Sequence, residues 1–256
     1  MDWSTGLRPV RMSLNQLIIS MEKTFKRVVI KVSGEAMSGD KETGLDINIV
    51  SQIVDKIKTA SETNHQISVV VGGGNFFRGR EIAKSGDERA AADYIGMLAT
   101  AMNALVLQIE LEKVGIQTRV MTALDMKSVA EPFIRRRAIR HLEKGRVVIF
   151  AAGTGLPFNS TDLAAVVRAL EISADMVLKA TLVDGVYTAD PKKDKNAAKI
   201  DKLSFEDVRQ KRLKVMDLPA VTLAEENDLP IRVFKLFGNN SLVDIIEGRG
   251  DYSEIS

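Results

Sequence analysis

The stretch Val69–Arg80 reads VVVGGGNFFRGR and contains the pattern on which the fold is built. Its valines are typical of a buried strand, and the three glycines that follow would end that strand in a turn. An asparagine and two arginines come after the glycines. Glycine allows close backbone approach, so the N–H groups of such a turn can point at phosphate oxygens. The stretch predicts a strand that ends either in an anion-binding loop or in an ordinary tight turn.

The same pattern of an apolar strand followed by a polar or glycine-rich turn recurs along the chain. Strands are predicted at 26–34, 66–74, 116–124, 146–155, 175–181 and 229–237. Helices are predicted by their sequence patterns at 47–63, 87–115, 131–145, 160–174, 205–210 and 215–227. Continuous apolar strands that alternate with helices indicate an α/β protein whose mostly parallel sheet is covered on both faces.

Composition limits the classes of protein that the chain can be. Its 256 residues are 45% hydrophobic and 27% charged, which suits a soluble globular protein with a sizeable core. The net charge of +2 implies no broad field for binding nucleic acid. With no cysteine and only two histidines, disulfides, thiolate chemistry and a multi-histidine metal site are excluded. We expect a cytoplasmic protein without a membrane partner, with 1–24 as a weakly ordered extension and 25–256 as the folded domain.

Polar residues gather where the predicted strands end. Strand by strand, they are Lys31, Ser33 and Gly34; Gly72, Gly73, Gly74, Asn75 and Arg78; Gly153, Thr154 and Gly155; and Lys179 and Thr181. In α/β folds, ligands bind at the carboxyl ends of the strands. Converging N–H groups and fixed positive charges suit phosphoryl transfer, which needs in-line positioning and neutralised charge more than covalent help.

Each of these features also has a plain structural explanation. A triple glycine is often a tight turn, the Lys31 side chain can extend to solvent, and Asp162 can be a helix cap. Three successive glycine-bearing strand ends with polar partners are improbable as independent turns, which favours a site. The motifs of Walker-A proteins, of dinucleotide-binding folds and of protein kinases are absent. A kinase with this sequence would therefore belong to another fold.

Six motifs, in this order, closely resemble those of the bacterial uridylate kinases of the amino acid kinase superfamily. They are KVSGEAM from Lys31, VVVGGGNFFRG from Val69, DYIGMLATAMNAL from Asp93, AAGTG from Ala151, VLKATLVDGVYTADP from Val177 and LKVMDL from Leu213. The resemblance implies a three-layer α/β/α sandwich of the amino acid kinase or carbamate kinase type. It also implies phosphoryl transfer from ATP to UMP in pyrimidine nucleotide synthesis. Mg²⁺ would be bound mainly through the ATP phosphates, and the protein itself would have no metal site.

The resemblance implies roles for individual residues. The catalytic residues would be Lys31, Arg78 and Asp162, with Asp162 orienting Lys31 rather than acting as a general base. The ATP-binding residues, in the C-terminal part for the adenosine, would be Lys31, Val32, Ser33, Gly34, Gly74, Arg78, Thr181, Tyr187 and Asp190. The UMP-binding residues would be Gly73, Asp93, Thr154, Gly155, Leu156, Pro157, Phe158, Asn159, Ser160 and Thr161. A buried core position is the alternative for Tyr187.

The loop GTGLPFNSTD at 153–162 departs from the pattern of the family it resembles. Leu156 stands where the family usually has asparagine, and Asn159 stands where an aromatic residue is usual. We expect Asn159 to replace part of the missing amide, while backbone groups keep the recognition of uracil. Leu182 stands where the family has a lysine near the ATP side.

The resemblance also implies a homohexamer that GTP activates and UTP inhibits. The place of the GTP loop is taken by Gly39, Asp40, Lys41, Glu42, Thr43 and Gly44, which keep only the glycine framework. The long helix predicted at 87–115 is apolar on more than one stripe, and is either a subunit interface or a fully buried core helix.

Two other functions stay open: another small-molecule kinase of the superfamily, and a nucleotide-binding regulator. Asp93 and the GMLAT segment argue against the first, and intact Lys31, Arg78 and Asp162 argue against the second.

Overall fold

The computed structural model describes residues 25–76, 86–189, 191, 193–213 and 215–256. Its strands are β1 (Arg27–Val32), β2 (Gln66–Val71), β3 (Thr118–Thr122), β4 (Glu131–Pro132), β5 (Val147–Ala151), β6 (Met176–Thr181), β7 (Val186–Tyr187), β8 (Lys199–Ile200), β9 (Lys202–Leu203), β10 (Ile231–Lys235) and β11 (Tyr252–Ile255). The main sheet has the order β4-β3-β5-β2-β1-β6-β10-β11-β9, and β7 and β8 form a separate pair. Every neighbouring pair from β4 to β10 is parallel. The predicted mostly parallel sheet is therefore confirmed.

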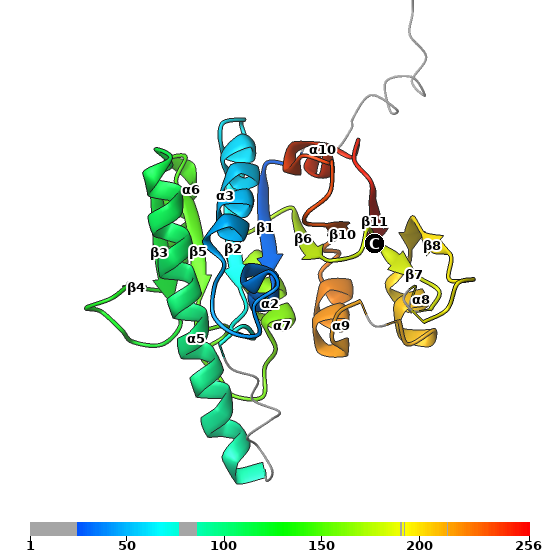
Figure 1. Ribbon diagram of the computed structural model, residues 1–256, viewed down its shortest axis with the longest axis horizontal. Helices are drawn as coiled ribbons and strands as arrows, with labels where there is room; N and C mark the ends of the chain where they lie inside the picture. Colours follow the sequence, from blue (N-terminus) through cyan, green and yellow to red (C-terminus); the bar gives the residue numbers. More distant parts are fainter. Residues whose placement is uncertain (1–24, 77–85, 190, 192, 214) are drawn as a thin grey trace, which may run out of the picture.

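Helices cover both faces of this sheet, as Figure 1 shows. They are α2 (Gly34–Ser38), α3 (Ile47–Ser61), α5 (Gly86–Lys113), α6 (Arg135–Glu143), α7 (Thr161–Glu171), α8 (Phe205–Gln210), α9 (Leu218–Glu226) and α10 (Leu242–Glu247). One apolar core packs α2, α3, α5 and α10 on the sheet, and a second core packs α6, α7, α8 and α9 on the opposite face. The arrangement is the predicted three-layer sandwich.

Strand β1 shows how the sequence produces the two cores. Val28 and Ile30 belong to the core under α3 and α5, whereas Val29 belongs to the core under α7. Alternation follows from the two-residue period of a strand, and complete burial of each such side chain stabilises the fold by about 1.5–3 kcal/mol. The same period turns Lys31 toward α7.

Helix α5 is the longest element and runs well past the end of β1 in Figure 1. Its segment Glu88–Lys113 is long and apolar enough to cross a membrane by length and composition, with a mean hydropathy of 1.4 in its most apolar window. Of that window, 44% is buried inside the fold, where Ala104, Leu107 and Leu111 belong to the first core. The helix therefore packs on the sheet and also keeps a long exposed side.

The structure differs from the predicted elements at the start of one helix and in several short elements. The helix predicted at 131–145 begins only at Arg135, and Glu131–Pro132 instead pairs with β3 at the edge of the sheet. Proline disfavours helix at the residue before it and is tolerated in an edge strand. The short elements α2, β7, β8, β9, α10 and β11 were not predicted. The sequence does carry signals for α10, since Ser241 caps it and Gly248 ends it with φ 81°. The predicted N-terminal extension lies outside the described residues.

Candidate active site

Lys31 and Lys179 lie side by side near the carboxyl ends of two neighbouring strands. Strands β1 and β6 are parallel, and their register pairs Lys31 with Lys179. Both side chains face α7, because they lie two residues beyond Val29 and Val177 of the second core. The chain continues from β1 to β2 on one side and from β6 toward β10 on the other. The two lysines thus lie at a topological switch point, where α/β sheets bind ligands.

Asp162 completes a cluster of three charged groups with these lysines. Asp162 Oδ1 lies 2.9 Å from Lys31 Nζ, and Oδ2 accepts a hydrogen bond from Lys179 Nζ at 2.6 Å. The three side chains are only 11–14% exposed. Ser160 rather than Asp162 caps α7, since its hydroxyl accepts a hydrogen bond from the Leu163 N–H at 3.0 Å. The explanation of Asp162 as a helix cap is therefore wrong, and its carboxylate is directed at two cations.

Burial and charge together set the ionisation of this cluster. Burial raises the pKa of Asp162, but Lys31 and Lys179 outweigh it and hold that pKa below its ordinary value. Burial lowers the pKa of Lys179, and the attraction of Asp162 offsets this only in part. The carboxylate is therefore ionised at neutral pH, and the two ammonium groups leave the cluster with an excess positive charge that suits an anionic ligand.

Asp217 is a second carboxylate near the cluster. It caps α9, accepting a hydrogen bond from the Ala220 N–H at 2.9 Å. Burial raises its pKa, and the nearby negative charge of Asp162 adds to that rise. Lys179 was among the strand-end residues expected to converge but was given no role, and Asp217 was not predicted. The lysine at an alternate position of an otherwise apolar strand, and the aspartate in the LKVMDL motif, were the available signals.

A cavity of about 200 Å³ opens on the β2 and β5 side of the cluster. It is bordered by Gly73, Gly74, Ala92, Asp93, Gly96, Met97, Thr100, Gly153, Thr154, Asn159, Ser160 and Thr161. Most of the described residues predicted to bind UMP come together here, and Thr161 directly precedes Asp162. Gly74 borders this cavity although it was predicted on the ATP side. Ala92, Gly96, Met97 and Thr100 were not predicted, because α5 was expected to be an interface or core helix. Gly153 was expected among the strand-end residues but was given no role.

Part of the predicted UMP loop turns away from this cavity. Gly155, Leu156, Pro157 and Phe158 are not among the described residues that border it, and Leu156 and Phe158 are 62% and 64% exposed. Asp93 Oδ2 accepts a hydrogen bond from the Phe158 N–H at 2.7 Å, which holds the loop against α5. Asn159 faces the opposite way and donates from Nδ2 to Thr154 Oγ1 at 2.9 Å. The unusual asparagine of this loop therefore borders the cavity, and the unusual leucine faces solvent.

The three glycines after β2 pack mainly against the protein itself. A Cβ on Gly72 would lie 2.8 Å from Gly34 N, and a Cβ on Gly73 would lie 2.5 Å from Gly96 O in α5. A Cβ on Gly74 would make only ordinary contacts, with Glu35 Cγ nearest at 3.4 Å. Gly72 and Gly73 therefore serve close packing of the strand end. Gly74 has the most room for a ligand.

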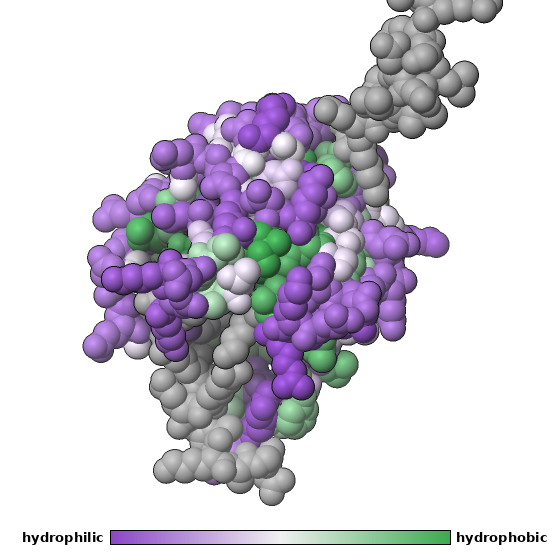
Figure 2. Space-filling view, turned by 90° about the vertical axis from the view of Figure 1, so that its right-hand side faces the viewer, coloured by the Kyte–Doolittle hydropathy of each residue, from purple (hydrophilic) through white to green (hydrophobic). Residues whose placement is uncertain are grey.

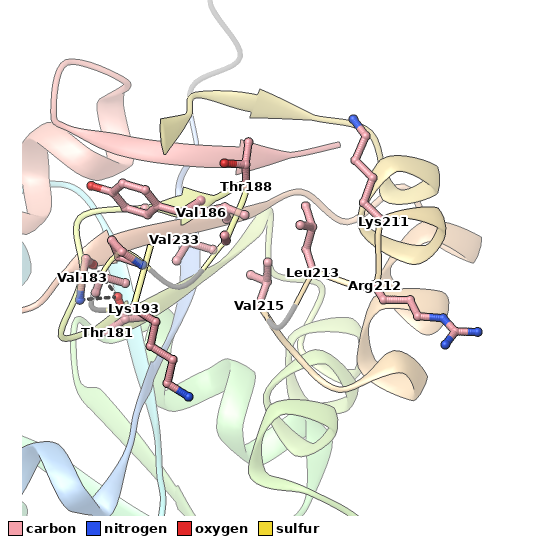
Figure 3. A pocket seen from close by; sticks show the side chains of 14 residues that line it. Thr181, Val183, Val186, Thr188, Lys193, Lys211, Arg212, Leu213, Val215 and Val233 are labelled. Atoms are coloured by element: carbon pink, nitrogen blue, oxygen red, sulfur yellow. Dashed lines mark hydrogen bonds between the residues drawn. The ribbon is translucent and has the colours of Figure 1, made fainter. Parts of the chain in front are cut away.

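A larger cavity of about 520 Å³ lies beside β6 and β7. Figure 3 shows its apolar floor of Val186, Val233, Leu213 and Val215, with the charged ends of Lys211 and Arg212 turned away from it. Figure 2 shows apolar side chains gathered near the middle of the face that carries β7, β8 and α8, between hydrophilic ones. An apolar floor of this kind suits the flat base of a ligand.

Of the residues predicted to bind ATP, Thr181 and Tyr187 border this larger cavity. Tyr187 is half-buried rather than in the core, and its hydroxyl donates to Asp184 Oδ1 at 2.7 Å. Val32 is a core residue, whereas Ser33 caps α2 and accepts from the Ala36 N–H at 3.2 Å. Arg78 and Asp190 lie outside the described residues.

The predicted regulatory segment Gly39–Gly44 is a surface loop. Asp40, Lys41, Glu42 and Thr43 are exposed, and Gly39 and Gly44 have φ of 58° and 84°, which non-glycine residues rarely adopt. The Gly44 N–H donates to the Asn75 carbonyl at 2.8 Å. The loop is therefore attached directly to the residue that follows the three glycines.

A parallel α/β sheet with a lysine–aspartate–lysine cluster between two cavities defines a protein of the phosphate-binding α/β class. Within this class, the model of the amino acid kinase family matches residues 26–235, and the chain belongs to that family. Its relatives include the uridylate kinase of Rickettsia bellii, which is 52% identical over 90% of this chain and 97% of its own length. The uridylate kinase of Paramagnetospirillum magneticum is also 52% identical, over 93% and 99% of the two chains.

Solved structures give the same assignment. The crystal structure of UMP kinase from Bacillus anthracis matches with a TM-score of 0.87 at 38% identity, covering 91% of this chain and 97% of that one. The UMP kinase of Ureaplasma parvum matches with a TM-score of 0.84 at 34% identity, over 91% and 99%. The resemblance found in the sequence motifs is thereby confirmed at the level of the whole domain.

Proposed function

We propose that this protein transfers the terminal phosphoryl group of ATP to UMP, giving ADP and UDP, in pyrimidine nucleotide synthesis. The observation that carries the proposal is the Lys31–Asp162–Lys179 cluster between two cavities of different character. The larger, apolar-floored cavity suits adenosine, and the smaller, polar cavity suits a nucleoside monophosphate. The likeness to uridylate kinases over most of the chain supports UMP as the acceptor.

The two lysines would stabilise the moving phosphoryl group. Their ammonium groups lie within 3 Å of the same carboxylate, so both can face one phosphoryl group as negative charge spreads over its oxygens. Asp162 would orient them and would not act as a general base, because its lowered pKa makes it a poor proton acceptor. The phosphate of UMP is already an anionic nucleophile and needs no base. Arg78 is proposed to add a further positive charge.

The remaining assignments are those that the sequence motifs imply. On the donor side we propose Lys31, Val32, Ser33, Gly34, Gly74, Arg78, Thr181, Tyr187 and Asp190. On the acceptor side we propose Gly73, Asp93, Thr154, Gly155, Leu156, Pro157, Phe158, Asn159, Ser160 and Thr161. The contacts of Asp93 and Asn159 described above support the acceptor side, and the apolar floor beside Thr181 and Tyr187 supports the donor side.

Mg²⁺ would neutralise charge on the ATP phosphates. Among the described residues, no three histidine, cysteine or carboxylate side chains gather as a set of metal ligands. Asp162 is already paired with two lysines, which leaves it little capacity as a ligand. This arrangement is compatible with an Mg²⁺ ion that is held mainly by the phosphates of ATP.

We also propose that the protein is a cytoplasmic homohexamer, activated by GTP and inhibited by UTP. An exposed apolar stripe on α5 supports an interface between copies, since Tyr94, Ile95, Leu98, Met102 and Ile109 are 42–53% exposed along one side. The exposed loop Gly39–Gly44 is the proposed GTP site.

An ADP-release assay with ATP, Mg²⁺ and a panel of acceptors tests the proposal. UMP is expected to react far faster than CMP, dTMP, AMP, GMP, acetylglutamate, aspartate or carbamate. Lys31→Ala and Asp162→Ala should abolish turnover while the protein stays folded. Turnover of an amino acid or of carbamate in place of UMP would favour another kinase of the family. Binding of UMP without any turnover would favour a regulator.

A further inference from the structure

Asn75 and Asn103 form a buried pair of side-chain amides behind the glycine loop. Asn75 follows the three glycines at the end of β2, and Asn103 lies on α5. The two residues are 2% and 0% exposed. Asn75 Nδ2 donates to Asn103 Oδ1 at 3.0 Å, and Asn103 Nδ2 donates to Asn75 Oδ1 at 2.7 Å. Asn75 is therefore turned into the core and away from the cavities, although its place at a strand end suggested a ligand contact.

The second N–H of each amide reaches a backbone carbonyl. Asn103 Nδ2 donates to Gly72 O at 2.7 Å, and Asn75 Nδ2 donates to Gly44 O at 2.9 Å. The pair thus uses all four of its N–H donors, and only an amide side chain of this size offers two donors and an acceptor. A buried donor or acceptor left without its partner costs about 1–3 kcal/mol, so the arrangement is strongly specified.

This amide pair sets how closely the ends of β1 and β2 approach each other. A Cβ on Gly34 would overlap Asn75 Oδ1 and would lie 2.7 Å from Gly74 N and 2.9 Å from Gly72 O. The amide of Asn75 therefore packs directly on Gly34. Gly34 stands on the proposed ATP side, and Gly74 borders the proposed UMP cavity. The separation of donor and acceptor backbones at this point follows from where Asn103 holds Asn75.

We propose that Asn75 and Asn103 are positioning residues for phosphoryl transfer, and that they connect the surface loop Gly39–Gly44 to the alignment of the two substrates. The inference rests on the proposed transfer from ATP to UMP. Neither residue touches a substrate; both act through the Gly34 and Gly72–Gly74 backbones. Displacing reacting groups by about 1 Å costs roughly 100-fold in rate, so a small shift of this pair would be felt at the reaction.

The connection to the loop acts in both directions. Gly44 and Asn75 share two hydrogen bonds, one from each residue to the carbonyl of the other. If bound substrates favour one position of Asn75, they also favour the position of Gly44 that fits its two hydrogen bonds with Asn75. The effect also runs from the loop to the substrates, because coupling between two sites is reciprocal. Substrates should therefore reduce the motion of the loop, and a variant without the amide pair should lose that effect.

Kinetics of Asn103 variants test the positioning role. Asn103→Leu keeps the approximate size and removes every polar contact, and Asn103→Ser is a milder change that stays informative if the leucine variant does not fold. Thr118→Val is the control, because Thr118 is also 0% exposed and loses one hydrogen bond, from its hydroxyl to Ile116 O at 3.0 Å. All kcat values are normalised to the fraction of protein that binds UMP in calorimetry.

We expect kcat to fall by about 10- to 100-fold in Asn103→Leu and less in Asn103→Ser, with KM for each substrate changing much less. Normalised kcat values equal to that of Thr118→Val would overturn the positioning role. If the wild-type protein does not phosphorylate UMP at all, the proposed function fails instead, so the two failures are distinct.

Hydrogen exchange of the segment 39–46 tests the connection. In the wild-type protein, addition of UMP with the ATP analogue AMP-PNP should slow exchange in this segment. In the Asn103 variants the slowing should be lost, while binding of UMP measured by calorimetry remains. Equal slowing in wild type and variants, or none in the wild type, would overturn the connection.

Discussion

The attraction between Asp162 and the two lysines of the buried Lys31–Asp162–Lys179 cluster should contribute strongly to the stability of the fold. The substitution Asp162→Asn measures how much stability is lost without it. The substitution keeps the shape of the side chain and removes a charge that lies 2.9 Å and 2.6 Å from two ammonium groups. By Coulomb's law with an effective dielectric constant near 20, each attraction is worth roughly 6 kcal/mol before ion desolvation is subtracted. Removal of one partner from a buried ion pair typically costs about 3–5 kcal/mol, since the remaining charge stays buried and uncompensated. Two lysines remain here, so we expect a loss toward the upper end.

Urea unfolding followed by circular dichroism at pH 7 gives the free energy of unfolding. Glu225→Gln is the matched control, because Glu225 Oε1 lies 2.9 Å from Arg209 Nη2 in an exposed pair whose side chains are 32% and 42% exposed. Its loss should be below about 1 kcal/mol. Equal losses in the two variants would refute the view that burial makes the cluster strong.

Acid adds a second test of the same variant. The folded-state pKa of Asp162 is below its ordinary value, so its contribution is complete above the ordinary pKa of 3.8 and is lost as pH falls through the folded-state pKa. Asp162→Asn lacks this contribution at every pH. The stability difference between wild type and variant should therefore shrink as the pH is lowered below about 4. A difference that stays constant down to acid unfolding would contradict the sign of the shift.

Three further changes test the site. Burial lowers the pKa of Lys179 from 10.5, so kcat should begin to fall at a pH below 10.5 as the lysine loses its proton. In a pH–rate profile, Lys179→Arg should move this fall to higher pH. An unchanged profile would contradict the role of the Lys179 charge. Gly73→Ala should destabilise by about 1–3 kcal/mol and raise KM for UMP, whereas Gly96→Ala, with open space for its Cβ, should not destabilise in thermal unfolding. The double change Leu156→Asn with Asn159→Phe should alter KM for UMP and the ratio of UMP to CMP turnover; unchanged values would show that Asn159 does not read the base.

The sequence carries the sheet and much of the site because both follow from local patterns. The alternation in β1 predicts two cores, and the strand ends predicted to converge belong to β5, β2, β1 and β6, which are neighbours in the sheet. Short elements such as β4 and α10 were misplaced or missed because their patterns are too brief to stand out. Asp217 and the pairing of Lys179 with Asp162 were missed for another reason. They depend on where α9 begins and on strand register, and neither is visible in a linear pattern.

The three glycines Gly72, Gly73 and Gly74 have separate roles. Positive φ is found at Gly153 and Gly155 after β5 but at none of Gly72 to Gly74, so the triplet is not needed for an unusual backbone angle. Gly72 and Gly73 are glycines because Gly34 and α5 lie too close for a side chain. Gly73 and Gly74, but not Gly72, border the smaller cavity. A glycine count therefore overstates how much of this loop can bind phosphate. The charge that would hold a phosphoryl group comes from Lys31 and Lys179, and the glycines bring the loop close enough to that charge to matter.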